Sequence, residues 1–107
     1  MSRRVSGLLL VCGLVPSTIA VAAEPAQITE LQKGMPATVA GLIARIVYCN
    51  HWSGEEPYDA DRAKQIQNAV SELKCDSLSA DEAAALKKYG QEPGVRRAIT
   101  KAGDVYL

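Results

Sequence analysis

Residues 1–23 have the pattern of an export signal, and this segment constrains the fold more than any other part of the chain. A pair of arginines comes first, an apolar run from Leu8 to Val15 follows, and small residues end the segment at Ala23. This order is typical of a secretory signal peptide that is removed after export. We therefore expect the longest apolar run to be lost and residues 24–107 to fold as a single small domain.

The end of this segment leaves alternatives open. Cleavage after Ala23 would place Val21 and Ala23 at the small-residue positions, whereas cleavage after Ala22 would place Ala20 and Ala22 there. An uncleaved membrane anchor is the rival interpretation, since a membrane helix needs about 17–25 apolar residues. Pro16 interrupts the segment, and its tail consists of small residues. We therefore expect cleavage after Ala23, a periplasmic or secreted protein, and no stable membrane span afterwards.

The charge balance argues against nucleic acid as a partner. The full chain has 12 basic and 12 acidic side chains, and removal of the signal takes two arginines away. The remaining domain is slightly acidic, whereas nucleic-acid binding requires a clustered basic surface.

Basic side chains are nevertheless concentrated in the last third of the chain, with Glu92 as the main interruption. One interpretation is a surface that docks onto an anionic partner, either lipid headgroups or a protein. The other is a set of ordinary solvated helix faces. The residues concerned are Lys87, Lys88, Arg96, Arg97 and Lys101.

Cys49 and Cys75 are the cysteines that remain after cleavage, and such a pair in a small exported chain predicts a disulfide. A domain of this size gains from a cross-link because its core is close to the lower limit for independent stability. The chain-entropy model gives about 3.5 kcal/mol for closing the intervening loop. The alternative is a zinc site with His51 as a third ligand, which requires both thiols to stay reduced.

The apolar periodicity predicts an all-α fold, a small bundle of three to four helices closed by the one disulfide. Pro36 suits the first turn of the first principal helix. Asp59 or Asp61 can cap the second helix. Ser79 and Glu82 form a capping box that would start the third. The expected helices cover residues 36–50, 61–74 and 80–90, with a short lead-in at 24–35 and a last short helix at 93–102.

The segment 50–61 carries the unusual side chains and is the candidate binding site. A bond between Cys49 and Cys75 brings the C-terminal ends of two helices together, so the connecting loop must run back along the second helix. We expect it to be stretched across the protein as a strap. Binding residues often lie on loops held by a rigid frame, and aromatic side chains are common anchors. The candidate residues are His51, Trp52, Glu55, Glu56, Tyr58 and Asp59.

A structural interpretation of the same residues competes with binding. The chain contains no phenylalanine, so Trp52 and Tyr58 would be available to fill the core beneath the strap. His51 follows a helix C-terminus, where a protonated imidazole interacts favourably with the helix dipole.

The sequence offers no convincing catalytic or cofactor site. His51 and Ser53 occur without a glycine-rich oxyanion loop, and adjacent Glu55 and Glu56 would point to opposite sides of an extended strand. The acidic loop does not have the ligand spacing of an EF-hand, and the two cysteines lack the CxxC spacing of thiol oxidoreductases. We expect a protein that is not an enzyme and has no cofactor.

The chain contains the segment Cys49-Asn50-His51-Trp52-Ser53-Gly54-Glu55-Glu56, followed by an amphipathic helix and Cys75. In this it resembles small exported helical proteins of Gram-negative bacteria that have no assigned activity. The resemblance covers residues 36–102 and implies export, the disulfide and the helices, but no catalytic or binding residues. The leading hypothesis is a periplasmic protein-interaction module, an inhibitor, immunity or accessory protein, that uses the 50–61 loop. The alternative is a metal-binding or metal-sensing module that uses the cysteines, His51 or the acidic loop.

Overall fold

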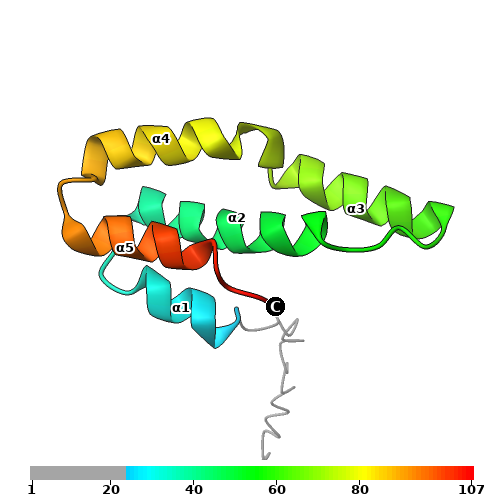
Figure 1. Cartoon of the computed structure of the whole chain (residues 1–107), viewed down its shortest axis with the longest axis horizontal. Coiled ribbons are helices and arrows are strands. Elements are labelled where there is room, and N and C mark those ends of the chain that lie inside the picture. The colour runs from blue at the N-terminus through cyan, green and yellow to red at the C-terminus, as the bar shows by residue number, and fades with distance from the viewer. Residues whose placement is uncertain (1–23) are drawn as a thin grey trace, which may run out of the picture.

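The computed structural model describes residues 24–107, and the expected signal segment 1–23 lies outside the described residues. Within residues 24–107 the protein is all-α, as predicted, and contains no strand (Figure 1). It has five α-helices, one more than the largest number expected. None of these helices is long and apolar enough to span a bilayer. The elements are α1 (Ala26–Gln32), α2 (Ala37–Ser53), α3 (Ala60–Glu72), the short 3₁₀ helix η1 (Cys75–Ser77), α4 (Leu78–Tyr89) and α5 (Pro93–Ala102).

Helix α2 is the centre of the fold, and α1, α4 and α5 pack around it. Its apolar residues recur at three- and four-residue steps, and Val39, Ile43 and Val47 are completely buried. We call α1, α2, α4 and α5 the body of the protein. Its buried core consists of Ile28 from α1, Val39, Leu42, Ile43, Ile46 and Val47 from α2, Ala85 from α4, and Val95, Ala98, Ile99 and Ala102 from α5.

Helix α3 lies outside this core. It contributes no buried residue, and its only neighbours among the helices are α2 and η1. The apolar stripe that predicts a packed helix, from Ala63 through Ile66 to Val70, is only half-buried. Hydrophobic burial therefore explains the position of the body helices far better than that of α3.

The predicted disulfide between Cys49 and Cys75 is confirmed. The two Cα atoms are 5.7 Å apart, within the usual range for a cystine. Cys49 is buried near the end of α2, and Cys75 is the first residue of η1. The bond thus ties the residues that follow α3 directly to the central helix.

Two of the helix boundaries that differ from the sequence prediction affect the candidate site or the disulfide region. Helix α2 continues to Ser53, so His51 and Trp52 lie in its last turn rather than in a loop. Helix α4 begins at Leu78, directly after η1, so the expected capping-box serine, Ser79, lies inside the helix. The reason is the disulfide: the chain turns at Cys75 in a 3₁₀ helix and enters α4 without a separate cap. The cap of α3 is confirmed, because Asp59 Oδ1 accepts a hydrogen bond from the Arg62 N–H at 2.7 Å.

Candidate functional site

The loop 54–59 and helix α3 together form a projecting arm, and we use this name for residues 54–72. Figure 1 shows the loop continuing outward from the end of α2, and α3 returning beside it. Helix α3 is about 20 Å long at about 1.5 Å per residue, and its C-terminal end meets α2 at Cys49, close to the end of α2. The first turn of α3 must therefore lie beyond α2.

The prediction that the loop is stretched across the protein as a strap is therefore wrong in one respect. The loop is extended and runs beside α3, as predicted, since Pro57 and Ala63 line the same small hollow. It does not cover the body, because α2 is longer than expected and directs the chain away from the core.

Arg62 of α3 connects its own helix to the loop and to the last turn of α2. Its guanidinium carbon lies 5.2 Å from the centre of the Trp52 ring, a distance at which a cation is attracted to the ring face. Its Nη2 atom lies 3.0 Å from Glu55 Oε2, and its Nη1 atom donates to Gln65 Oε1 at 3.0 Å. One side chain of α3 thus contacts both the last turn of α2 and the loop.

His51 takes part in the same cluster. Its Nε2 atom lies 3.3 Å from the second oxygen of Glu55, and its ring meets Trp52 edge to face with the centroids 5.4 Å apart. The structure therefore brings three of the candidate residues, His51, Trp52 and Glu55, into one half-buried cluster. This cluster attaches the loop to α2, and these side chains have less surface free for a partner than the sequence suggested.

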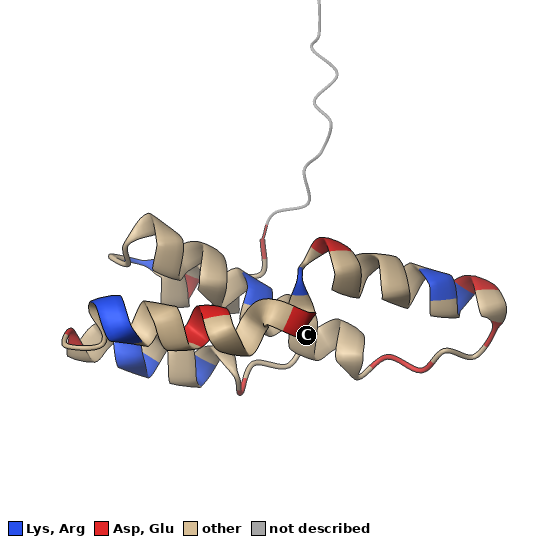
Figure 2. Ribbon diagram, turned by 90° about the horizontal axis from the view of Figure 1, so that it is seen from above, with Lys and Arg blue, Asp and Glu red and all other residues tan. Residues whose placement is uncertain are grey.

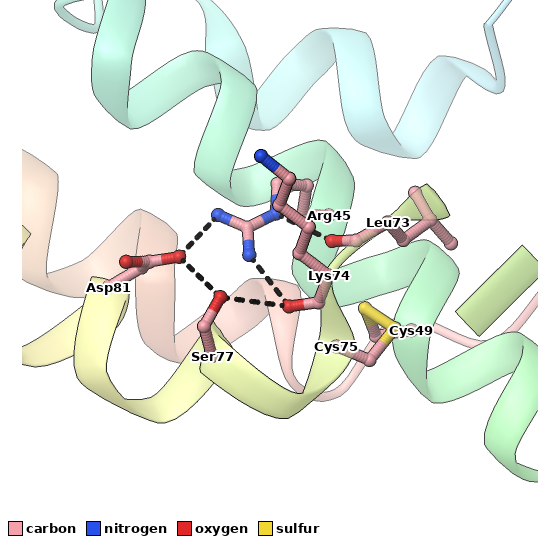
Figure 3. Close-up of a disulfide and its surroundings, with 7 residues drawn as sticks. All are labelled: Arg45, Cys49, Leu73, Lys74, Cys75, Ser77 and Asp81. Carbon is pink, nitrogen blue, oxygen red and sulfur yellow. Dashed lines mark hydrogen bonds and ion pairs between the residues drawn. A yellow bond between two sulfur atoms is a disulfide. The ribbon is translucent and has the colours of Figure 1, made fainter. Parts of the chain in front are cut away.

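The base of the arm is held by Arg45 of α2 (Figure 3). Arg45 Nε donates to the Leu73 carbonyl at 2.9 Å and Nη2 donates to the Lys74 carbonyl at 3.0 Å. The last carbonyls of a helix have no partner within the helix, and here Arg45 supplies one for two residues that directly follow α3. Lys74 itself has a positive φ of 53°, the left-handed conformation that commonly ends a helix.

Asp81 of α4 completes the contact on the other side of Arg45. Arg45 Nη1 lies 2.9 Å from Asp81 Oδ2, and the Ser77 hydroxyl lies 3.2 Å from the same oxygen. The hydrogen bond from Arg45, followed by that from Ser77, lowers the pKa of the Asp81 carboxyl below its usual value of 3.8. The carboxylate form is thereby favoured, and α2, η1 and α4 are joined at one point.

The outer end of the arm presents the remaining candidate residues. Tyr58 is 77% exposed, so its interpretation as a core-filling residue is wrong. Glu56, Asp59 and Asp61 are also exposed around it, although one oxygen of Asp59 is engaged as the α3 cap. We call residues 56–61 the tip. The tip combines one exposed aromatic ring with three acidic side chains.

The body has a groove between α2 and α4. It has a volume of about 500 Å³ and is floored by small or apolar residues, among them Gly41 and Ala84. The Arg45–Asp81 ion pair lies at one end and Lys88 borders the other. Its opening follows from the small side chains on the facing helices, which leave the space above Gly41 unfilled.

The two arginines that position the arm were missed by sequence reasoning. A signal for Arg45 was present, because it is the single lysine, arginine or acid in an otherwise uncharged helix from Ala37 to Ser53. Arg62 offered no comparable signal, since a basic residue in the first turn of a solvated helix is ordinary. Its role depends on Trp52 being helical, which the expected boundary at residue 50 did not include.

The geometry does not favour the metal alternative. A zinc site would require Cys49 and Cys75 as thiolates, and the two sulfur atoms are joined. Across residues 24–107, no group of three or more His, Cys, Asp or Glu side chains is arranged to hold a metal ion.

Comparison of the chain with protein-family models, with curated proteins and with solved structures returned no match.

Proposed function

We propose that the protein is an exported, non-enzymatic protein-interaction module of the periplasm, an inhibitor, immunity or accessory protein, and that the arm is its contact surface. One observation carries this proposal. Helix α3 has 13 residues and none of them is buried, yet a disulfide, Arg45 and the Arg62–Trp52 contact hold it in place. A helix that adds so little to the core and is nonetheless fixed is well suited to present a surface.

Fixing the arm in advance also favours binding. Association loses free energy when loops and side chains must be ordered, and a surface that is already rigid avoids part of that cost. The contacts of Arg45 lie at the base of the arm and those of Arg62 lie in the first turn of α3, next to the tip, so the arm is held at both ends.

The tip has the chemistry of a binding surface. Exposed aromatic side chains such as Tyr58 are frequent binding hot spots, and the exposed fraction of 77% leaves the ring available. Acidic residues around such an anchor accelerate encounter with a basic partner and disfavour acidic ones. The partner that fits is a protein with a basic rim around an apolar recess.

Export and the absence of catalysis are supported by two features. The disulfide is compatible with an oxidising compartment. Glu55 contacts His51 through one carboxylate oxygen and Arg62 through the other, so both of its oxygens are engaged within the protein.

Site-directed photo-crosslinking in the native cell tests the proposal. A photoreactive residue at position 58 should give discrete adducts with one partner, and the same residue at Lys33, an exposed position on α1, should not. The variant Tyr58→Ala combined with Glu56→Gln should weaken capture of that partner about tenfold or more, whereas Glu72→Gln at the other end of α3 should leave it unchanged. Equal adducts from positions 58 and 33, or undiminished capture by the tip variant, would contradict the proposal.

Trp52→Ala serves a separate purpose in the same experiment. Trp52 contacts Arg62 within the protein, so its removal loosens the arm without altering the tip. Reduced capture by this variant with an intact tip would show that the fixed position of the arm matters for binding.

A further inference from the structure

Helix α5 presents a basic face on the side opposite to its buried residues. Arg96, Arg97 and Lys101, with Pro93 and Thr100, line a shallow hollow of about 460 Å³. All five side chains are exposed, and the helix from Pro93 to Ala102 contains no acidic residue. We call this surface the basic face.

The charges of the basic face have no acidic partners within the described part of the chain. No ion pair of residues 24–107 includes Arg96, Arg97 or Lys101; Arg96 Nε reaches only the Gly90 carbonyl, at 3.4 Å. Lys87 and Lys88 extend the positive charge onto the last turn of α4. This end of the molecule therefore carries a cluster of cations without ion-pair partners, with Glu92 as the acidic residue that precedes α5.

The acidic tip lies at the opposite end of the molecule. Figure 2 shows basic positions on α4 and α5 towards one end of the molecule and acidic positions along the loop of the arm at the other end; α3 also carries basic positions and α4 acidic ones. The two surfaces are too far apart to contact each other within one molecule, so each remains available to a second copy.

A protein surface fits the basic face better than a lipid surface does. Peripheral membrane binding is strengthened by apolar side chains that enter the bilayer, and α5 exposes no large apolar residue. Within residues 24–107 the exposed large apolar side chains are Tyr58, Tyr106 and Leu107. The hollow between Arg96, Arg97 and Lys101 instead offers space for a ring with negative charges beside it.

We propose that the tip of one copy binds the basic face of another, with the Tyr58 ring in the hollow of α5 and Glu56 and Asp61 facing its arginines and lysine. The inference rests on the proposed function of the arm and names a second copy as a partner. Because the two surfaces differ, the contact is heterologous, and each pair retains one free tip and one free basic face. Association should therefore extend with concentration and weaken with salt, which screens exposed charges.

Sedimentation velocity of the processed, disulfide-intact protein tests this contact. In low-salt buffer the sedimentation coefficient should rise with protein concentration, and in about 0.5 M salt, where the Debye length is a few ångströms, the rise should be largely lost. A tip variant, Glu56→Gln with Tyr58→Ala and Asp61→Asn, should remain monomeric. A basic-face variant, Arg97→Gln with Lys101→Gln, should also remain monomeric.

Mixing the two variants gives the decisive result. The tip variant retains a basic face and the basic-face variant retains a tip, so an equimolar mixture should form dimers that cannot extend. The control Glu30→Gln with Glu72→Gln removes two acidic charges outside the tip and should associate like the unaltered protein. Helical circular dichroism, unchanged in all variants, verifies that each is folded.

Three results would overturn the inference. The first is a monomer at every concentration in low salt, and the second is association that either variant leaves intact or that mixing fails to restore. The third is binding to phosphatidylglycerol vesicles that the basic-face variant loses, without self-association, which would assign the face to a lipid surface. A monomer that still forms the adducts from position 58 would overturn this inference alone and leave the proposed function standing.

Discussion

The body and the arm show two different ways of fixing a helix in a small protein. Helices α1, α2, α4 and α5 share one buried core, and each fully buried aliphatic side chain contributes roughly 1.5–3 kcal/mol. Helix α3 has no buried residue and depends on Cys75, Arg45 and Arg62. An exposed ion pair contributes only about 0.2–1 kcal/mol, so the disulfide is the strongest single restraint on the arm.

This difference has a consequence for local stability. Segments with few buried contacts open at lower free energy than the global unfolding of the protein. The arm should therefore exchange its amide hydrogens faster than α2 and α5. The body sets the overall stability, and the polar and covalent contacts set the position of the arm.

Matched substitutions in the body and in the arm should show the largest difference in the free energy of unfolding. Ile43 is completely buried in α2, so Ile43→Ala should lower the free energy of unfolding by about 4 kcal/mol. Ile66 has a half-buried side chain in α3, so Ile66→Ala should cost about 1 kcal/mol. Denaturant unfolding of both variants measures the contrast. Equal losses in the two variants would contradict this prediction, because they would mean that α3 is packed as firmly as the body.

Removal of the disulfide comes next in size. The bond closes a separation of 26 residues, which corresponds to about 3.5 kcal/mol in the chain-entropy model. In the variant Cys49→Ala with Cys75→Ala, hydrogen exchange should become fast in α3 while α2 and α5 stay protected. Residues 93–102, which do not contact α3, serve as the internal control. Simultaneous loss of protection in α5 would show that the arm and the body unfold as one unit.

Much of this architecture could be predicted from the sequence because it depends on local patterns. The apolar steps from Val39 to Val47 predict the buried face of α2, and Asp59 is a cap recognisable by residue type. The pairing of Cys49 with Cys75 follows from their number once export is assumed. Each of these features is decided within a few residues or by elimination.

The direction of the arm could not be predicted in the same way. It depends on whether α2 ends at residue 50 or at Ser53, which is a difference of less than one turn. Neither helix propensity nor a helix-breaking residue distinguishes these two ends, because the first breaker after residue 50 is Gly54. That shift places Trp52 opposite Arg62 and turns the loop outward. The exposure of Tyr58 follows from this tertiary arrangement. The sequence favoured a buried Tyr58, because a chain without phenylalanine has few aromatic residues to fill its core.

The smallest expected effect concerns the contact that joins the arm to the body at Asp81. Because Arg45 and Ser77 lower the pKa of this carboxyl in the folded protein, its contribution is fully present above the usual value of 3.8 and is lost as the pH falls through the lowered folded value. Asp81→Asn should therefore reduce stability at pH 7 and make little difference in strong acid, where the carboxyl is protonated. A double-mutant cycle with Arg45→Met, measured by denaturant unfolding at both pH values, isolates the pair. A coupling between positions 45 and 81 that persists unchanged in acid would contradict a charge-dependent interaction between Arg45 and Asp81.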